Sequence, residues 1–251
     1  MATIALSTSA VDRKASERRF YSGMAAFLIL LVLLGFGPSF YLRGVVPPFP
    51  RPNPTLSPAV VLHGVVFTLW MALLIAQTRL IAARKYEVHM KLGKLGMILA
   101  IVMIPVMYLT AVWQVARANQ PPFTDPLTWT IVPLATIIPF AALVWGGWQK
   151  RREVQSHKRL MLSAAILVVI GPTIGRLPIA PPTAAGFTFQ MLLGFLVFVP
   201  LLLWDRRTNG VIHPATKFGM AMATLWVVFP LAVFWGKLPW AKVAAYLPGV
   251  S

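Results

Sequence analysis

Seven apolar runs divide the chain, and short polar or proline-containing segments separate them. The runs cover residues 20–42, 57–83, 94–115, 128–148, 160–179, 187–204 and 218–235. Each approaches the roughly 20 residues that a helix needs to cross a ~30 Å hydrocarbon core. None shows the period-2 alternation of a membrane β-barrel strand, and an open strand cannot satisfy its backbone in lipid. The pattern predicts an all-α integral membrane protein, a bundle of seven transmembrane helices.

Little of the chain is left outside these runs. Residues 1–19 are polar and form an N-terminal arm, residues 20–236 form the transmembrane domain, and residues 237–251 form a tail. The first run has the positive flank of a signal peptide, but it is too long and lacks a small-residue cleavage site. We therefore expect it to remain as the first span, and we predict no soluble domain.

The composition agrees with a membrane location. The chain has 251 residues, of which 58% are hydrophobic and 12% charged, with a mean hydropathy of +0.73. A soluble domain carries about 25% charged residues, and a disordered chain is far less hydrophobic. Cysteine is absent, so disulfides, thiolate chemistry and cysteine-ligated metals are excluded.

The net charge of +17 is distributed as a topological signal. Seventeen of the 23 Lys and Arg residues lie in the arm and around the connections between runs two and three, four and five, and six and seven. The other side holds six. The positive-inside rule then places the N-terminus in the cytoplasm and the C-terminus outside. The charge is thus explained by membrane anchoring, and we predict no nucleic-acid partner.

Three of the four histidines are predicted to lie on the basic side. His89, His157 and His213 each follow basic residues near the start of a span. Imidazole binds Zn, Cu, Fe and Ni, so a shared metal site is one interpretation. No H-x-x-H or H-x-x-x-H pair and no neighbouring carboxylate pair accompanies them. This favours the alternative, in which each histidine caps or anchors a helix at the headgroup layer.

The fourth histidine, His63, lies about six residues inside the second run, or roughly 9 Å along a helix axis. An ionisable side chain at that depth is expected to face the bundle or a cavity. Arg43, Tyr108 and Arg176 fall near the same outer side, so the four predict a polar pocket there. Guanidinium groups suit a quinone head, haem propionates or a phospholipid headgroup. In the alternative, His63 makes one interhelical hydrogen bond and both arginines extend to lipid phosphates.

A haem in this pocket needs a second axial ligand. Only His63 is predicted to be buried among the histidines, so the partner is expected to be a methionine of the third run. Met103 and Met107 are the candidates, because His/Met ligation occurs in cytochromes.

Several enzyme and transporter classes are disfavoured. All six acidic residues are predicted to lie in loops or at span ends, whereas a proton- or sodium-coupled transporter usually has a carboxylate in the membrane. The chain has no glycine-rich phosphate loop and no G-x-S-x-G elbow. We predict no catalytic residue.

Part of the chain resembles a family of uncharacterised bacterial multi-pass membrane proteins. The shared features are Leu62-His63, Trp70 and Gln77, then His89-x-x-Leu92-Gly93, and later the sequence His157-Lys158-Arg159-Leu160-Met161. Family members carry similar H-R-R-L-G and H-R-x-W-M signatures at the starts of two helices. The resemblance covers residues 57–179, and position 160 is leucine where the family commonly has an aromatic residue. It implies a multi-pass protein of the bacterial inner membrane and supplies no reaction.

The sequence thus favours a non-catalytic accessory or assembly subunit of a larger membrane complex, or a lipid-binding protein. Its expected partners are membrane lipids and another membrane protein or a second copy of itself. The first alternative is an electron-transfer protein that binds a single haem b or a quinone through His63. The second is metal handling by the histidines of the basic side.

Overall fold

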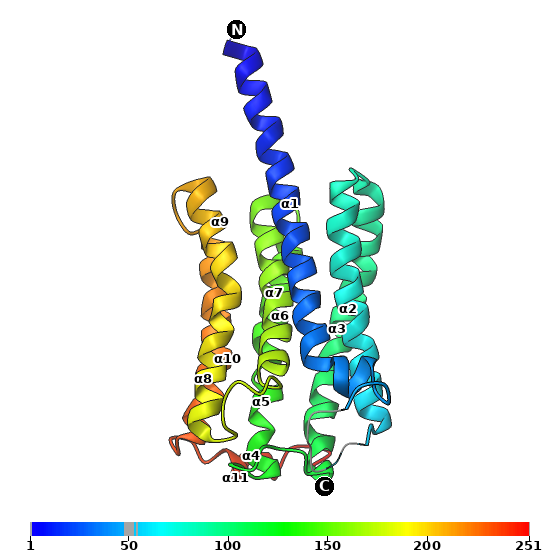
Figure 1. The fold of residues 1–251 in the computed structure, drawn as a ribbon, viewed down its shortest axis with the longest axis vertical. Helices are drawn as coiled ribbons and strands as arrows, with labels where there is room; N and C mark the ends of the chain where they lie inside the picture. Colours follow the sequence, from blue (N-terminus) through cyan, green and yellow to red (C-terminus); the bar gives the residue numbers. More distant parts are fainter. Residues whose placement is uncertain (1, 48–52, 54, 251) are drawn as a thin grey trace.

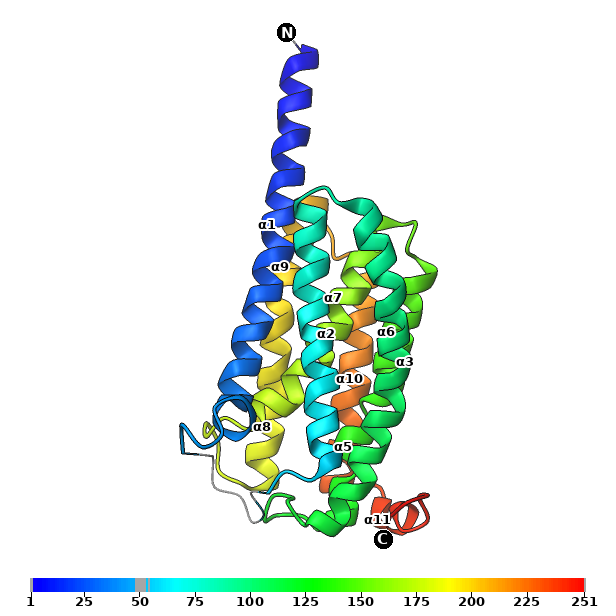
Figure 2. The ribbon, with the colours of Figure 1, turned by 90° about the vertical axis from the view of Figure 1, so that its right-hand side faces the viewer.

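The computed structural model describes residues 2–47, 53 and 55–250, and these form a bundle of helices (Figures 1 and 2). Seven helical spans among the described residues are long and apolar enough to cross a membrane, which confirms the predicted all-helical architecture with seven spans. The elements are α1 (Ala2–Phe36), the π-helical turn η1 (Gly37–Tyr41), α2 (Pro58–Ala82), α3 (Tyr86–Arg117), α4 (Pro126–Trp129), α5 (Ile131–Leu134), α6 (Ile137–Gln149), α7 (Val154–Ile174), α8 (Ala184–Gly194), the 3-10 turn η2 (Phe195–Phe198), α9 (Val199–Asn209), α10 (Pro214–Phe234) and α11 (Trp240–Ala244).

The two ends of the bundle differ in charge and in what they carry. The connections α2–α3, α6–α7 and α9–α10 lie at one end, and α1 projects beyond the bundle at this same end (Figure 1). We call it the basic end, because most Lys and Arg residues lie in and around these connections. The chain finishes at the opposite end, where α4 and α11 lie (Figure 1).

Helix α7 forms the centre of the bundle. In its most apolar window 78% of the residues are buried inside the protein, against 17% for α2. Small residues allow neighbouring helices to approach closely. A Cβ at Gly171 of α7 would overlap the indole ring of Trp226 on α10, and a Cβ at Gly35 of α1 would lie 2.9 Å from the Cα of Thr173. The side chains of α7 are therefore the ones best placed to join the other helices.

Proline explains where the spans are interrupted. The fourth span is divided into α4, α5 and α6, with Pro133 inside α5 and Pro139 in the first turn of α6. Proline lacks the N–H that a continuous helix needs and clashes with the preceding turn. In contrast, α3, α7 and α10 continue through Pro105, Pro172 and Pro230. Transmembrane helices tolerate such prolines where neighbouring groups satisfy the released carbonyls.

The helices extend further than the apolar runs. Helix α1 begins at Ala2, so the predicted arm is the first part of a helix that continues into the first span, apart from residue 1, which lies outside the described residues. Residues 2–19 contain neither proline nor glycine to stop it. The predicted tail contains the short helix α11, and its last residue, 251, lies outside the described residues.

Candidate functional site

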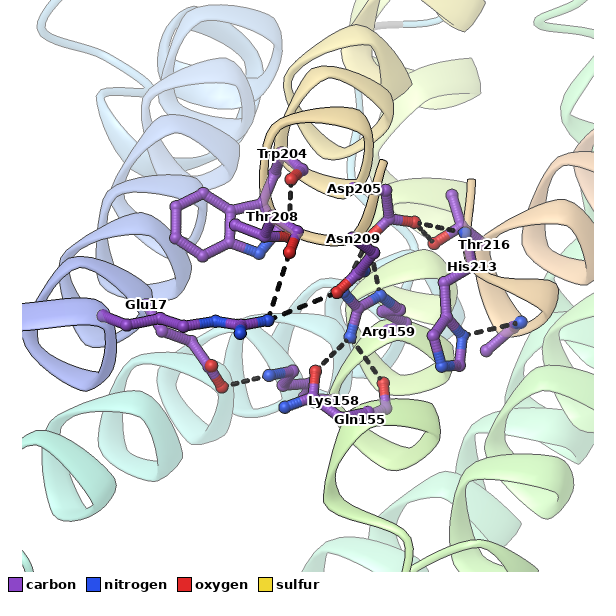
Figure 3. A network of polar contacts seen from close by, with 12 residues as sticks. Glu17, Gln155, Lys158, Arg159, Trp204, Asp205, Thr208, Asn209, His213 and Thr216 are labelled. Carbon is purple, nitrogen blue, oxygen red and sulfur yellow. Dashed lines mark hydrogen bonds and ion pairs between the residues drawn. The ribbon is translucent and has the colours of Figure 1, made fainter. Parts of the chain in front are cut away.

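A buried ion pair joins two helices at the basic end (Figure 3). Arg159 of α7 and Asp205 of α9 are both completely buried, and Arg159 Nη2 lies 2.6 Å from Asp205 Oδ1. Arg159 Nε donates to the same oxygen at 2.7 Å. Its Nη1 donates to the backbone and side-chain oxygens of Gln155 at 2.9 and 2.7 Å. Every nitrogen of the guanidinium thus faces an acceptor.

The second carboxylate oxygen of Asp205 connects the pair to α10. It accepts from Thr216 Oγ1 at 2.6 Å and from the backbone N–H of His213 at 3.0 Å. The His213 Nδ1 in turn accepts from the N–H of Ala215 at 3.1 Å and caps α10. We call Arg159, Asp205 and Thr216, together with the exposed Gln155, the clamp. Both charges are paired with each other within the protein, so the clamp holds helices together.

Two contacts at the edge of the bundle fasten α1 to this region. Glu17 forms an ion pair with Lys158, and both side chains are partly buried. Arg13 Nη2 donates to the backbone oxygen of Thr208 at 3.2 Å and to Asn209 Oδ1 at 3.5 Å. Helix α1 is therefore joined to both α7 and α9 at the basic end (Figure 3).

A second cluster at the basic end contains two histidines. His89 of α3 and His157 of α7 have ring centroids 6.4 Å apart, with ring planes at 87°. The His157 Nδ1 lies 2.8 Å from the backbone oxygen of Gly147 on α6. Because a carbonyl only accepts, Nδ1 carries the proton, and the Nε2 of the neutral ring keeps its lone pair. In metal sites, a ligating histidine commonly donates its other ring N–H to a backbone carbonyl, as His157 does here.

The groups around His89 are not satisfied. The backbone carbonyl of Gln77 on α2 lies close to the His89 imidazole. The Gln77 Oε1 and the His89 Nδ1 are both buried, and neither has a hydrogen-bond partner among the described residues. Unpaired buried polar atoms cost free energy. We call His89, His157 and Gln77 the histidine pair site, and it has donor atoms that are available to a ligand.

The structure brings together two of the three histidines that the sequence grouped. His213 is the N-cap residue of α10, whereas the rings of His89 on α3 and His157 on α7 lie next to each other. The lone pair of the His213 Nδ1 is used by the Ala215 N–H. Among the described residues, no group of three or more His, Asp or Glu side chains is placed to hold a metal ion.

The residues of the predicted outer pocket make contacts with different parts of the protein. The His63 ring stacks on Phe67 with centroids 4.1 Å apart, and its Nδ1 is buried without a partner in the described part of the chain. Arg176 lies within electrostatic range of His63, and its guanidinium covers the ring of Phe36 at 4.4 Å. These two predicted site residues are neighbours.

The other two predicted pocket residues, Tyr108 and Arg43, and the candidate haem ligand Met107 have different surroundings. The Tyr108 hydroxyl donates to the backbone oxygen of Pro248 at 2.8 Å, which links α3 to the tail. Met107 is buried in the hydrophobic core. Arg43 is exposed after η1, within electrostatic range of Arg117. The haem ligation by His63 and Met107 stays a prediction.

Sequence reasoning missed the acidic member of the clamp. Asp205 was expected in a loop or at a span end, and it does lie about one turn before the end of its span, in α9, but its complete burial was not foreseen. Its position next to Arg206 and Arg207 in the sequence hid it among surface charges. Gln155 and Thr216 gave no signal at all, because their role depends on helices that meet only in the folded bundle.

Comparison of the chain with protein-family models, with curated proteins and with solved structures finds no significant match to any of them. The function must therefore be argued from the geometry of the two clusters.

Proposed function

We propose that this chain is a non-catalytic membrane protein that binds a divalent transition-metal ion through His89 and His157. The observation that carries the proposal is the pair of imidazoles with unsatisfied donors beside it. With metal–nitrogen bonds of about 2.1 Å and a tetrahedral angle, two imidazoles on one ion have ring centroids roughly 5.3 Å apart. The two rings are 6.4 Å apart, so an approach of about 1 Å by the side chains lets them share an ion.

The site offers only a few protein ligands, and their small number indicates what the site can do with a bound ion. Structural zinc sites close four positions with protein side chains, whereas sites that act on a ligand keep a position open. Here two imidazoles supply two ligands, which leaves room for a donor from another molecule. Such a site suits an accessory protein that receives and passes on an ion, which combines the metal-handling and accessory-subunit hypotheses.

The test is metal binding by the detergent-purified protein. We expect one equivalent of Co²⁺ to bind with a visible d–d absorption, and Zn²⁺ to displace it. His89→Ala and His157→Ala should each remove this absorption. His63→Ala is the matched control and should leave it unchanged. Undiminished Co²⁺ binding by the double variant His89→Ala/His157→Ala would disprove the proposal.

An absorption spectrum of the same sample distinguishes the alternative cofactor. A Soret band that survives in the double histidine variant but disappears in His63→Ala would establish the electron-transfer alternative at the outer end instead. A sample without a Soret band that holds the added ion at His89 and His157 supports the metal proposal. Elemental analysis after dialysis gives the stoichiometry in either case.

The cellular setting is part of the proposal. We infer that the protein lies in a bacterial inner membrane with the basic end in the cytoplasm, because basic segments are retained on that side. The metal site would then face cytoplasmic ion pools. A reporter enzyme that is active only outside the cytoplasm, fused after Val250, should be active, and the same reporter fused before Ala2 should be inactive. The reverse result would contradict this orientation.

The accessory role requires a partner membrane complex. Solubilisation in a mild detergent, followed by native gel electrophoresis, should show the chain migrating with other membrane proteins. Migration as a monomer at all detergent concentrations would contradict the accessory role without affecting the metal site.

A further inference from the structure

A shallow groove lies between the first part of α1 and the end of α9, and its lining contains none of the residues of the histidine pair site. It has a volume of about 230 Å³ and is lined by Arg13, Ser16, Trp204, Arg207 and Thr208. Figure 3 shows Trp204 and Thr208 on the face of α9 that is turned towards α1. The lining thus combines two guanidinium groups, two hydroxyl groups and one indole ring.

Arg13 is held in place by the protein. Its Nη2 donates to the Thr208 backbone oxygen and to Asn209 Oδ1 at the C-terminal end of α9. A guanidinium has five N–H donors, so these bonds leave donors for a second acceptor. The Thr208 hydroxyl donates to the Trp204 backbone oxygen at 2.7 Å and keeps its lone pairs for a donor. The cationic side of the groove is therefore partly preorganised.

The positive charge of the groove is not balanced by the nearest carboxylates. Glu17 is paired with Lys158, and Asp205 is paired with Arg159. Asp12 is exposed, and it is not a member of any of the three ion pairs found among the described residues. Arg13 and Arg207 thus present charge towards an external anion.

A stacked pair of aromatic rings beside the groove indicates the level at which the groove lies in the membrane. The rings of Trp204 and Phe20 stack with centroids 4.5 Å apart and planes at 11°. Tryptophan favours the layer between headgroups and hydrocarbon. An anion in the groove therefore lies at headgroup level, with an apolar wall below it.

We propose that this groove binds a phosphate group, as carried by an anionic phospholipid headgroup or by a soluble phosphate ester. Arg13 and Arg207 supply the charged N–H donors, Ser16 supplies a hydroxyl donor, and the Trp204 ring contacts the apolar part of the ligand. Guanidinium matches phosphate in charge and planar geometry. The inference is independent of the metal proposal.

The experiment compares bound lipid in variants of equal charge. Native mass spectrometry of the full-length protein with added phosphatidylglycerol should show a retained lipid, and phosphatidylcholine should be retained less. Arg13→Gln/Arg207→Gln should weaken phosphatidylglycerol retention about tenfold, as expected for lost charged hydrogen bonds. Lys14→Gln/Arg206→Gln changes the neighbouring exposed residues by the same charge and should retain the lipid.

Three outcomes decide the proposal. Equal loss in the two double variants would overturn it, because the effect would then be general surface charge. Binding of glycerol 3-phosphate to delipidated protein, lost in Arg13→Gln/Arg207→Gln only, supports the site with a soluble ester as ligand. Binding of neither the lipid nor the ester would overturn it. Arg207→Gln alone serves as a second variant if loss of the Arg13 contacts prevents folding, and it should also weaken retention.

Discussion

Arg159 of α7 and Asp205 of α9 form an ion pair in which both side chains are completely buried, with 2.6 Å between Nη2 and Oδ1. The pair is surrounded by further hydrogen bonds to Gln155, Thr216 and the His213 backbone. A buried pair gains little over apolar packing, but removing one partner leaves a charge without compensation. Its contribution is therefore to fix how α7, α9 and α10 meet.

Removal of one charge from this pair should destabilise the protein strongly. We expect Asp205→Asn to lower the free energy of unfolding by about 3 to 5 kcal/mol, because Arg159 stays buried without a counter-charge. Arg159→Met/Asp205→Asn removes both charges and should recover a large part of the loss. Unfolding in detergent, followed by tryptophan fluorescence, measures both. A double variant as unstable as Asp205→Asn would contradict this explanation.

The clamp shows which features of the fold could be predicted from the sequence and which could not. The seven spans could be predicted because each needs only a run of apolar residues, which local composition reveals. The pairing of Arg159 with Asp205 spans 46 positions and depends on the packing of α7 against α9. Charges near span ends are usually anchors, so nothing in the local pattern separates Asp205 from its exposed neighbours.

The histidines also show that the sequence identifies candidate residues but not which of them meet in the folded bundle. Their residue type and their place at span starts identified His89 and His157 as candidates, and the bundle brings these two together. His213 instead caps α10 through its Nδ1, and nothing in the local sequence separates this role from that of the other two histidines. Gln77 appeared only as part of a resemblance, and its unsatisfied oxygen becomes visible only when α2 and α3 are packed.

Close helix packing predicts a second effect. Gly171→Ala should lower the free energy of unfolding by about 1 to 3 kcal/mol, because the added Cβ overlaps the Trp226 ring and overpacking forces α7 and α10 apart. Gly23→Ala is the matched control, since a Cβ there has no neighbour within 4 Å. Thermal unfolding of both variants in the same detergent is the measurement. Equal stability of the two would show that α10 adjusts without cost.

The ion pair between Glu17 and Lys158 should be weaker than the clamp. Both side chains keep some exposure, 24% and 14%, so solvent screens their attraction. We expect Glu17→Lys to lower the free energy of unfolding by about 1 kcal/mol and Glu17→Lys/Lys158→Glu to restore most of it. A double-mutant cycle at low and high salt measures the coupling. A coupling that is absent at low salt would mean that α1 docks without this pair.

The cap of α10 predicts a dependence of stability on pH. Burial and the positive charges of Arg159 and Lys158 lower the pKa of His213 below its ordinary value of 6.5, while Asp205 and Glu153 act in the opposite direction. Below pH 6.5 the unfolded chain then holds more protons than the folded protein at this site, so folding stability falls as the pH falls. Protonation also removes the lone pair with which Nδ1 accepts from the Ala215 N–H.

His213→Asn isolates this contribution, because asparagine is a good cap residue and does not titrate. The wild-type protein and the variant should have similar unfolding temperatures at pH 8, and the variant should lose less between pH 7 and pH 5. The other three histidines are the same in both proteins, so the difference between the two curves belongs to His213. Superimposable pH curves would mean that the His213 imidazole has the same pKa in the folded and unfolded states, and that its proton plays no part in holding α9 to α10.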